Sequence, residues 1–427
     1  MRVFLQDCIK TVIDNRGVTP HKRGTEWQDS GIMVLSANNV KTSGLQNMDQ
    51  VRFIPEEIYD SWMKIPLERG DLILTSEAPA GEVYYWDSDE KVVLGQRLYG
   101  LKIKEGINSK YLKYYLQSNA GQKAIRQQQS GSTVFGISAT TFQNIVVELP
   151  EKDVQDNIAN ILSAIDEKID NNNAICADLE GMAKLLYDYW FVQFDFPDEN
   201  GKPYKSSGGK MVWNEELKRE IPEGWEVKAL KGLYQIERGL SYTSKDIETG
   251  VGVPMLNLAC VDTNRNYRDG ELKYHAGKVP DSAFVNAGDL MIACTDLTRE
   301  RAIIGCPILV PDDGLRYTYS MDLAKISFPS SLLDEMYMYM TLRTEFYHNY
   351  IKEWASGTTV LHLNLKGIDW YNICIPPMSL QEKYAKIMRN VHSKKSQILS
   401  ENRDLTSLRD FILPMLMNGQ VRVKEGA

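Results

Sequence analysis

Cysteine is scarce and scattered in this sequence. The six cysteines lie far apart, and none belongs to a CxxC pair. Disulfide frameworks and structural zinc sites both need clustered cysteines, so this spacing predicts free thiols in a reducing compartment. Apolar runs are also short. No segment approaches the roughly 20 residues that a membrane span needs, and no signal peptide is visible. We therefore expect a soluble cytoplasmic protein that makes no membrane contact.

Recognised catalytic signatures are missing as well. The sequence has no glycine-rich cofactor loop after a strand, no HExxH motif and no DPPY or NPPY methylation motif. Ile375 precedes Pro376-Pro377, where an adenine methylase would need Asn or Asp. The five histidines are dispersed along the chain. These absences predict a non-catalytic chain without a cofactor or metal of its own.

Two short patterns imitate active sites. Gly208-Gly209-Lys210 resembles a phosphate loop, but Met211 occupies the place of the magnesium-binding Ser or Thr. Asp198, followed much later by Glu226-Val227-Lys228, resembles a nuclease site, which would need both acids around one magnesium ion. A nuclease that uses these acids is therefore one alternative function, and a purely structural adaptor is another.

The sequence also lacks an excess of basic over acidic residues. The formal net charge is −8, which argues against non-specific coating of nucleic acid but leaves room for a local basic patch. The chain has 427 residues, 43% of them hydrophobic, which is enough for two or three domains with real cores.

A long amphipathic helix is the dominant feature that is present. From Leu149 to Trp190, apolar residues such as Ile158, Leu162 and Leu185 recur at gaps of three and four, which predicts a single helix with one apolar stripe. The inner positions are interrupted at Asn172-Asn173, and near Lys394-Lys395 in a second long helix that is expected later in the chain. A polar residue in a helix seam fixes register at some cost in stability, and a water-exposed end of the helix pair is the alternative explanation.

The same stretch occurs twice. Residues 149–186 match residues 375–412 at a constant offset of 226 without gaps, as in Ala159 with Ala385. A long-period repeat of this kind indicates a duplicated structural unit. Because both helices have apolar seams, we expect them to pair with each other within the chain. In the second helix, Pro414 should kink or end the regular structure, and Gly419 suits a helix stop.

Each helix follows a mixed α and β segment. In the first segment, alternating or β-branched runs predict strands, and one helix is expected over 109–129. The predicted strands are Ile32–Leu35, Leu72–Thr75, Glu82–Trp86, Lys91–Leu94, Leu98–Ile103 and Ile145–Leu149. The second segment repeats the first loosely, for instance Gly288-Asp289-Leu290 after Gly70-Asp71-Leu72. Between them, 193–220 has no apolar period and is expected to be a linker with at most one short helical turn.

The loops of both segments contain residues suited to DNA. Arg, Asn and Gln make bidentate contacts with base edges, whereas Ser, Thr and Lys serve phosphates. The candidate contacts are Lys22, Arg23, Asn38, Arg97, Ser132, Thr133, Arg238, Tyr242, Lys245, Asn257, Arg265, Arg268, Arg299, Arg301, Thr358 and Thr359.

The whole chain resembles the specificity subunits of type I restriction-modification systems. The resemblance is carried by LPEKDVQDNIANILSAIDEKI, the segment from YDYWFVQFDFPDENGKPY to REIPEGWEV, the two Gly-Asp-Leu strands and the closing LPMLMNGQVRV. It implies an α+β chain with two pseudo-symmetric target-recognition domains separated by two long antiparallel helices in a coiled coil. The expected boundaries are 1–150 and 221–377 for the domains, 151–192 and 378–420 for the helices, and 193–220 for the linker.

The resemblance also implies a function. Each recognition domain would read one half of a bipartite, asymmetric sequence in double-stranded DNA. The helices would act as a spacer and would dock two modification subunits, which carry the S-adenosylmethionine chemistry, and the restriction subunits through them. The chain itself would be the non-catalytic specificity subunit of the methyltransferase and endonuclease complex.

Overall fold

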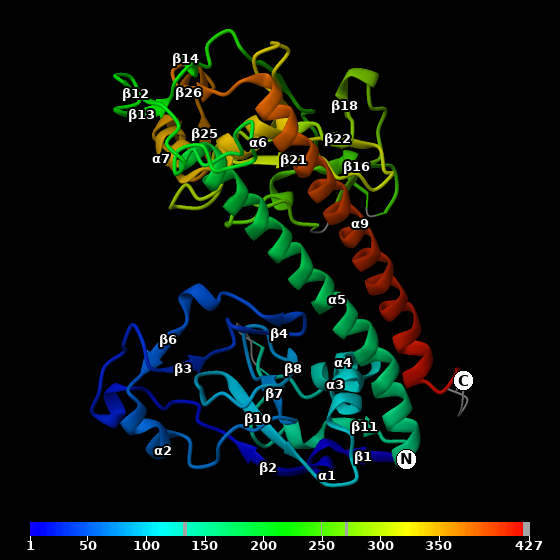
Figure 1. Ribbon diagram of the computed structural model, residues 1–427. Coiled ribbons are helices and arrows are strands. Elements are labelled where there is room, and N and C mark those ends of the chain that lie inside the picture. Colours follow the sequence, from blue (N-terminus) through cyan, green and yellow to red (C-terminus); the bar gives the residue numbers. More distant parts are fainter. Residues whose placement is uncertain (131–134, 249, 270–271, 422–427) are drawn as a thin grey trace. The chain divides into compact units, whose positions relative to one another are not determined.

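The computed structural model describes residues 1–130, 135–248, 250–269 and 272–421. The chain divides into two compact units, one formed by Met1–Asp170 with the chain from Asp404 onward, the other by Asn171–Arg403. Both boundaries fall inside long helices, so each helix contributes one segment to each unit. Figure 1 shows these helices as α5 and α9.

The two predicted long helices are present close to their expected limits. Helix α5 covers Lys152–Tyr187 and continues into a π-helical turn at Asp188–Val192, and α9 covers Met378–Met417. In each unit a segment of α5 lies beside a segment of α9 (Figure 1). Their contacts run in opposite directions along the chain, since Ala183 meets Tyr384 whereas Asn172 meets Asn402. The pairing is therefore antiparallel.

The polar interruption of the helix seam is a hydrogen-bonded cluster. Asn172 is 1% exposed, and its Nδ2 donates to Glu401 Oε2 at 2.9 Å and to Asn402 Oδ1 at 2.8 Å. Asn402 Nδ2 in turn donates to Asn173 Oδ1 at 2.9 Å. Because these groups satisfy one another only in this alignment, they fix the register of the two helices.

The predicted apolar stripe is only partly buried. Ile158 and Leu162 are buried, as expected, whereas Met182 and Leu185 are 66% and 68% exposed. The spacing of three and four residues identifies the apolar face of the helix, but it does not show how much of that face the neighbouring helix covers. The apolar face of α5 is therefore wider than the part that is buried.

Helix α9 does not end at Pro414, contrary to the expectation that the regular helix would stop or kink there. It continues to Met417, and Pro414 lies in its last turn. A proline so near the end removes one backbone donor but leaves few following turns to disturb. Gly419 has a φ of +67° and donates its N–H to Leu416 O at 3.2 Å, as predicted for a helix stop.

The first domain contains two main sheets. Its four-stranded antiparallel sheet has the order β2-β10-β7-β8, and a three-stranded sheet has the order β6-β3-β9, in which β3 and β9 are parallel. The strands are β2 (Ile9–Ile13), β3 (Ile32–Leu35), β6 (Arg52–Ile54), β7 (Leu72–Thr75), β8 (Val83–Tyr85), β9 (Val92–Leu94) and β10 (Leu98–Ile103). All five predicted strands of these sheets are confirmed.

The second domain repeats this topology. A four-stranded sheet of order β15-β23-β19-β21 accompanies a sheet of order β17-β16-β22-β18, in which β16 and β22 are parallel. The strands are β15 (Gln235–Arg238), β16 (Val253–Leu256), β17 (Lys273–His275), β18 (Phe284–Val285), β19 (Leu290–Ala293), β21 (Pro307–Leu309), β22 (Tyr317–Tyr319) and β23 (Leu323–Ser327). The loose sequence repeat therefore reflects a true repeat of the fold.

Each domain is closed by an antiparallel pair of its first and last strands. In the first, β1 (Arg2–Phe4) pairs with β11 (Val146–Glu148), the last of the predicted strands. In the second, β14 (Glu226–Ala229) pairs with β26 (Asn372–Ile375). The two ends of each domain therefore lie next to each other, and each last strand leads into a long helix.

The helix expected over 109–129 is broken in two. Helix α3 covers Ser109–Gln117, and α4 covers Asn119–Arg126. Ser118 has an extended backbone, and its Oγ accepts from Gly121 N at 3.2 Å and donates to Tyr115 O at 2.6 Å. Serine competes for backbone hydrogen bonds in this way at helix starts. The apolar period alone concealed the interruption.

The segment 193–220 is ordered rather than largely irregular. Strands β12 (Met211–Asn214) and β13 (Arg219–Pro222) form a hairpin. Phe194 is 2% exposed and packs edge-on against Trp225, with ring centroids 5.5 Å apart. Aromatic side chains attach this segment to the core of the second domain. Their spacing in the sequence matches neither a helix nor a strand, so the pattern did not predict this packing. The expected short helical turn is replaced by this hairpin.

The second domain has further short elements around its sheets. Helices α6 (Glu335–Arg343) and α7 (Glu345–Ile351) meet at Thr344, and strands β20 (Thr295–Asp296), β24 (Ala355–Ser356) and β25 (Leu361–Leu363) form a small sheet. Its core continues onto α9 through Leu380, Tyr384 and Met388. The core of the first domain continues onto the other end of α9 through Leu416 and Met417.

Candidate nucleic-acid interface

The parallel strands β3 and β9 bring distant loops together in the first domain. Leu35 and Leu94 are opposite each other, and Gly95 N donates to Leu35 O at 2.8 Å. The loops that follow these strands carry the predicted contacts Asn38 and Arg97, both exposed. Ligands often bind where the carboxyl ends of parallel strands meet. The structure thus gathers two of the sequence-predicted residues at one strand edge.

A cavity of about 340 Å³ lies at this edge and includes residues that the sequence did not single out. Its lining comprises Val18, Trp27, Val34, Ser36, Asn38, Asn39, Gln50, Arg52, Trp62, Gly95 and Gln96. Asn39 has a structural role, since its Oδ1 accepts from Ser36 N and Oγ and its Nδ2 donates to the carbonyls of Gln46 and Asn47. Trp27 and Arg52 were missed because only the fold brings them together.

The first domain has two other described residues of the predicted set, and Arg97 has a partner of its own. Lys22 and Arg23 are exposed on a short 3-10 turn (His21–Arg23), and Lys22 Nζ donates to Gly17 O at 2.7 Å. Arg97 has a φ of +66° and forms an ion pair with Glu77 at 3.3 Å. The predicted contacts Ser132 and Thr133 lie outside the described residues.

Equivalent loops in the second domain follow β16 and β22. Ser320 N donates to Leu256 O at 2.9 Å, as Gly95 does to Leu35. Asn257 follows β16 but is 4% exposed, and its side chain accepts from Ala259 N and donates to Met255 O. This predicted contact therefore holds the loop.

The other predicted residues near this edge are more accessible. Arg238 ends β15, and its Nη1 is 3.5 Å from Met321 O. Lys245 is exposed on a 3-10 turn (Ser244–Asp246). Tyr242 is half-buried, and its hydroxyl accepts from Lys273 Nζ at 3.1 Å.

Two predicted arginines are held by partners within the second domain. Arg265, with a φ of +65°, forms an ion pair with Glu345, and Arg268 donates from Nε and Nη2 to Ala259 O. Near Arg265, burial and the positive charge of that arginine lower the pKa of His348 to about 4, so this imidazole is neutral at pH 7. These partners within the domain could not be read from the sequence, and both arginines stay predicted contacts.

The remaining predicted residues gather at a second edge. Strand β20 pairs with β25 so that Asp296 is opposite Leu361, which places the chain after Asp296 beside the hairpin between β24 and β25. Thr358 and Thr359 lie exposed in this hairpin. The loop after Asp296 contributes Arg299, which is exposed, and Arg301, whose Nη1 donates to Lys352 O at 3.0 Å.

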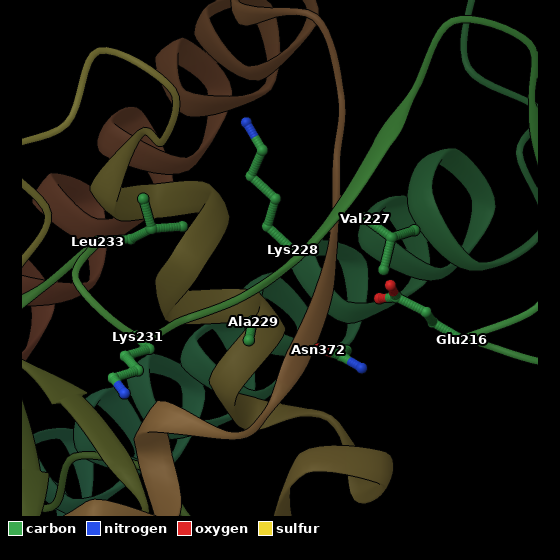
Figure 2. A pocket seen from close by; sticks show the side chains of 7 residues that line it. All are labelled: Glu216, Val227, Lys228, Ala229, Lys231, Leu233 and Asn372. Carbon is green, nitrogen blue, oxygen red and sulfur yellow. The ribbon is translucent and has the colours of Figure 1, made fainter.

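A wider hollow of about 420 Å³ lies elsewhere in the second domain. Figure 2 shows its lining residues, and Lys228 and Lys231 point in different directions. Lys228 pairs with Glu226 at 2.6 Å, and Lys231 lies over the Trp370 ring at 5.2 Å from its centroid. The two ammonium groups therefore do not converge on one anion.

The residues of the two imitation motifs have structural partners. Asp198 Oδ1 accepts from the backbone N–H groups of Asn200 and Lys202, each at 2.8 Å, and so closes a turn. Lys210 pairs with Glu223. Within the described part of the chain, no group of three or more His, Cys, Asp or Glu residues is arranged to hold a metal ion. All six cysteines are free thiols, as predicted.

No helix in the described residues is both long and apolar enough to span a bilayer.

Two repeated α+β domains joined to paired long helices define the architectural class of this chain, and comparison with known proteins identifies its family. The family model for the type I restriction modification DNA specificity domain matches residues 3–181 and again 222–404. The specificity subunit of the MjaIX type I restriction enzyme of Methanocaldococcus jannaschii is 26% identical over 84% of this chain and 79% of its own length. That of HindI from Haemophilus influenzae is 22% identical over 84% of this chain and 88% of its own length.

The fold is also found in a solved structure. The crystal structure of the S subunit of a type I restriction-modification system from M. genitalium matches 97% of this chain and 95% of that chain, with a TM-score of 0.57 and 15% identity. This likeness shows the shared fold, and the two matches of the family model show the family. The chain belongs to the specificity subunits of type I restriction-modification systems.

Proposed function

We propose that each recognition domain reads one half of a bipartite, asymmetric sequence in double-stranded DNA. The supporting observation is that the two domains share strand order and register, whereas their loops carry unrelated residues. Asn38 and Arg97 follow the parallel strands of the first domain, and Asn257 and Met321 lie after those of the second. Two domains that share a strand frame but differ in their loop residues are suited to reading two different base sequences.

The exposed members of the predicted set are the proposed contacts. In the first domain these are Lys22, Arg23, Asn38 and Arg97. In the second they are Arg238, Lys245, Arg268, Arg299, Thr358 and Thr359, and the half-buried Tyr242 is kept with them. Arg265, Arg301 and Asn257 are less exposed and act on DNA only through the loops that they hold.

The helices provide docking sites for two modification subunits in this proposal. The exposed apolar pair Met182 and Leu185 recurs 226 residues later as Leu408 and Phe411, which are 48% and 67% exposed. Exposed apolar pairs of this kind mark interaction sites. Two copies of one surface suit two copies of one partner. The modification subunits would bring S-adenosylmethionine and the chemistry, and the restriction subunits would join through them.

The paired helices also act as the spacer between the two half-sites. They are continuous between the units, and the Asn172 cluster fixes their alignment. Such a spacer sets half-site separation, as dimer geometry does in other DNA readers. The chain works on cellular DNA in the cytoplasm and is not itself catalytic.

Genome-wide mapping of adenine methylation tests this function. Cells with the gene should carry one bipartite methylated motif that disappears when the gene is deleted. The purified chain alone should transfer no methyl group from S-adenosylmethionine, whereas the complex with modification subunits should methylate the motif. Methyl transfer by the chain alone, or an unchanged methylation pattern after deletion, would contradict the proposal.

A further inference from the structure

An aromatic and cationic pair stands at the strand edge of the first domain. Trp27 is 40% exposed, and the Arg52 guanidinium carbon lies 5.2 Å from the centroid of its ring. Arg52 lies on β6 opposite Val34 of β3. Within the described residues its guanidinium forms no ion pair or hydrogen bond. The attraction between a cation and an aromatic ring is weak at exposed sites. The Arg52 guanidinium and the Trp27 ring each have a second face on which another planar group could stack.

The cavity beside this pair has the chemistry of a site for a flat, polar ring. At about 340 Å³ it lies at the small end of ligand pockets, which span roughly 300–1,000 Å³. Trp62 lines it while being 1% exposed, and its indole N–H has no hydrogen-bond partner among the described residues. Gln50 and Gln96 contribute side-chain amides that make no hydrogen bond within the same part of the chain. Aromatic faces combined with free donors and acceptors are what proteins use to hold an unstacked nucleobase.

The second domain has a comparable pair, in which the cation occupies the same position of the fold. Lys273 lies on β17 opposite Met255 of β16, and its Nζ is 5.4 Å from the centroid of the Tyr242 ring. Strands β6 and β17 each pair antiparallel with the first strand of the parallel pair. Arg52 and Lys273 also have the same register. Each is opposite the residue that comes one before the last paired residue of the parallel strand, which is Leu35 in the first domain and Leu256 in the second. Both domains thus have a cation beside an aromatic ring here, although the rings come from different loop positions and Lys273 also donates to the Tyr242 hydroxyl at 3.1 Å.

We propose that Trp27, Arg52 and the cavity form a nucleobase-binding site of the first domain, and that Tyr242 and Lys273 are its counterpart in the second. The inference rests on the proposed function insofar as the base belongs to the target DNA. The same chemistry would also accept the base of a free nucleotide. Trp27 and Tyr242 provide stacking faces, and Arg52 and Lys273 provide the positive charge for the attached phosphate.

The test uses the complex of the full chain with its modification subunits. Trp27→Leu and Arg52→Met are compared with Trp213→Leu and Arg2→Met, which remove an exposed tryptophan and an exposed arginine away from the cavity. Target duplexes carry 2-aminopurine at successive positions of each half-site, because its fluorescence rises when it leaves the base stack. In the wild type we expect a rise at one position of the half read by the first domain. Trp27→Leu should abolish that rise and weaken binding about tenfold or more, and the controls should match the wild type.

A second arm tests the free nucleotide. If that is the source, nucleoside monophosphates alone should quench tryptophan fluorescence saturably in the wild type but not in Trp27→Leu. The inference is overturned if folded Trp27→Leu and Arg52→Met bind duplexes and nucleotides as the wild type does and methylate the same motif. Arg52→Met removes only an exposed cation and carries the test if Trp27→Leu does not fold. Failure of the proposed function is distinct, since the wild-type complex would then show no motif at all.

Discussion

Arg403 connects helix α9 with two carboxylates of the second domain. Its Nη1 donates to both oxygens of Asp269 at 3.0 Å, and its Nη2 donates to Asp313 Oδ2 at 2.5 Å. The Asp313 side chain is fully buried. Removing one partner of such a group leaves an uncompensated buried charge, which costs several kcal/mol.

Arg403→Met should therefore lower the free energy of unfolding by about 3 kcal/mol, as measured by urea denaturation. Lys218→Met removes an exposed ion pair with Glu215 from the same unit and should leave the unfolding midpoint almost unchanged. Equal effects of the two substitutions would show that burial does not decide the strength of these contacts.

Asp166 forms the corresponding contact in the first unit. Its carboxylate accepts from Lys113 Nζ at 2.9 Å, Tyr114 OH at 2.6 Å and Arg409 Nη1 at 3.0 Å. Burial by itself would raise its pKa, but Lys113, Tyr114 and Arg409 together hold the pKa below the ordinary 3.8. A carboxyl with a lowered folded pKa stabilises the protein above its unfolded pKa, and this contribution is lost as the pH falls through the folded value.

The substitution Asp166→Asn should thus destabilise the protein most at pH 5 and above. The difference from the wild type in thermal unfolding should begin to shrink as the pH falls from 5 through 3.8 towards 3, because the unfolded chain then takes up the proton before the folded protein does. A difference that stays constant over this range would show that the charge of Asp166 makes no contribution.

The residue types in the sequence predicted candidate DNA contacts, but they did not predict which residues each candidate would contact in the folded protein. Exposed Arg238 is the last residue of β15 and buried Asn257 directly follows β16, but only the folded structure shows that the Asn257 amide is used within its own loop. Trp27 and Arg52 are 25 positions apart in the numbering, and no local pattern links them. They meet because β6 pairs with β3, which is a tertiary event.

At the scale of elements, the long helices were predictable from two independent signals. Residues 149–186 recur without gaps at 375–412, and apolar residues in both stretches are spaced by three and four positions. Helix α5 begins within three residues of the expected start at Leu149. The break at Ser118 and the hairpin of β12 and β13 were not predictable, because a single serine and a few aromatic contacts outweigh the local pattern.

The repeated apolar pairs give the docking proposal a direct test. Leu185→Asp and Phe411→Asp place a charge on one pair each and should each remove one modification subunit, so that native mass spectrometry shows one in place of two. The double variant should bind none. Trp213→Asp, a charge at another exposed apolar position, should keep both. Retention of two modification subunits by the double variant would place docking elsewhere.

Helix length tests the spacer. One heptad inserted after Asp170 in α5, with a matching heptad before Asp404 in α9, adds about 10.5 Å to both helices. The methylated motif should then have a different unspecified spacer, by about three base pairs. An unchanged spacer would show that the helices do not set half-site separation.

At the scale of the whole chain, the duplication explains most of what the sequence predicted. Both the family match and the topology occur twice, at 3–181 and 222–404. The matching residues of the two domains are not separated by a constant number of positions, because loop lengths differ between the domains. The strand order of the second domain could therefore not be predicted from the repeat. Pairing of β14 with β26 shows that this domain nevertheless closes as the first one does.

That closure makes the first domain a module whose ends meet. The Met1 amino group donates to Leu149 O at 2.9 Å, and Arg2 is paired with Glu148 in the register of β1 and β11. Residues 1–150 can therefore be exchanged for the equivalent segment of a relative without altering the helices.

Mapping the methylated motif of this exchanged chain tests the central claim most directly. If each domain reads one half-site, the half assigned to residues 1–150 should change to that of the relative, while the other half and the spacer stay the same. A change in both halves would contradict the assignment of one half-site to each domain.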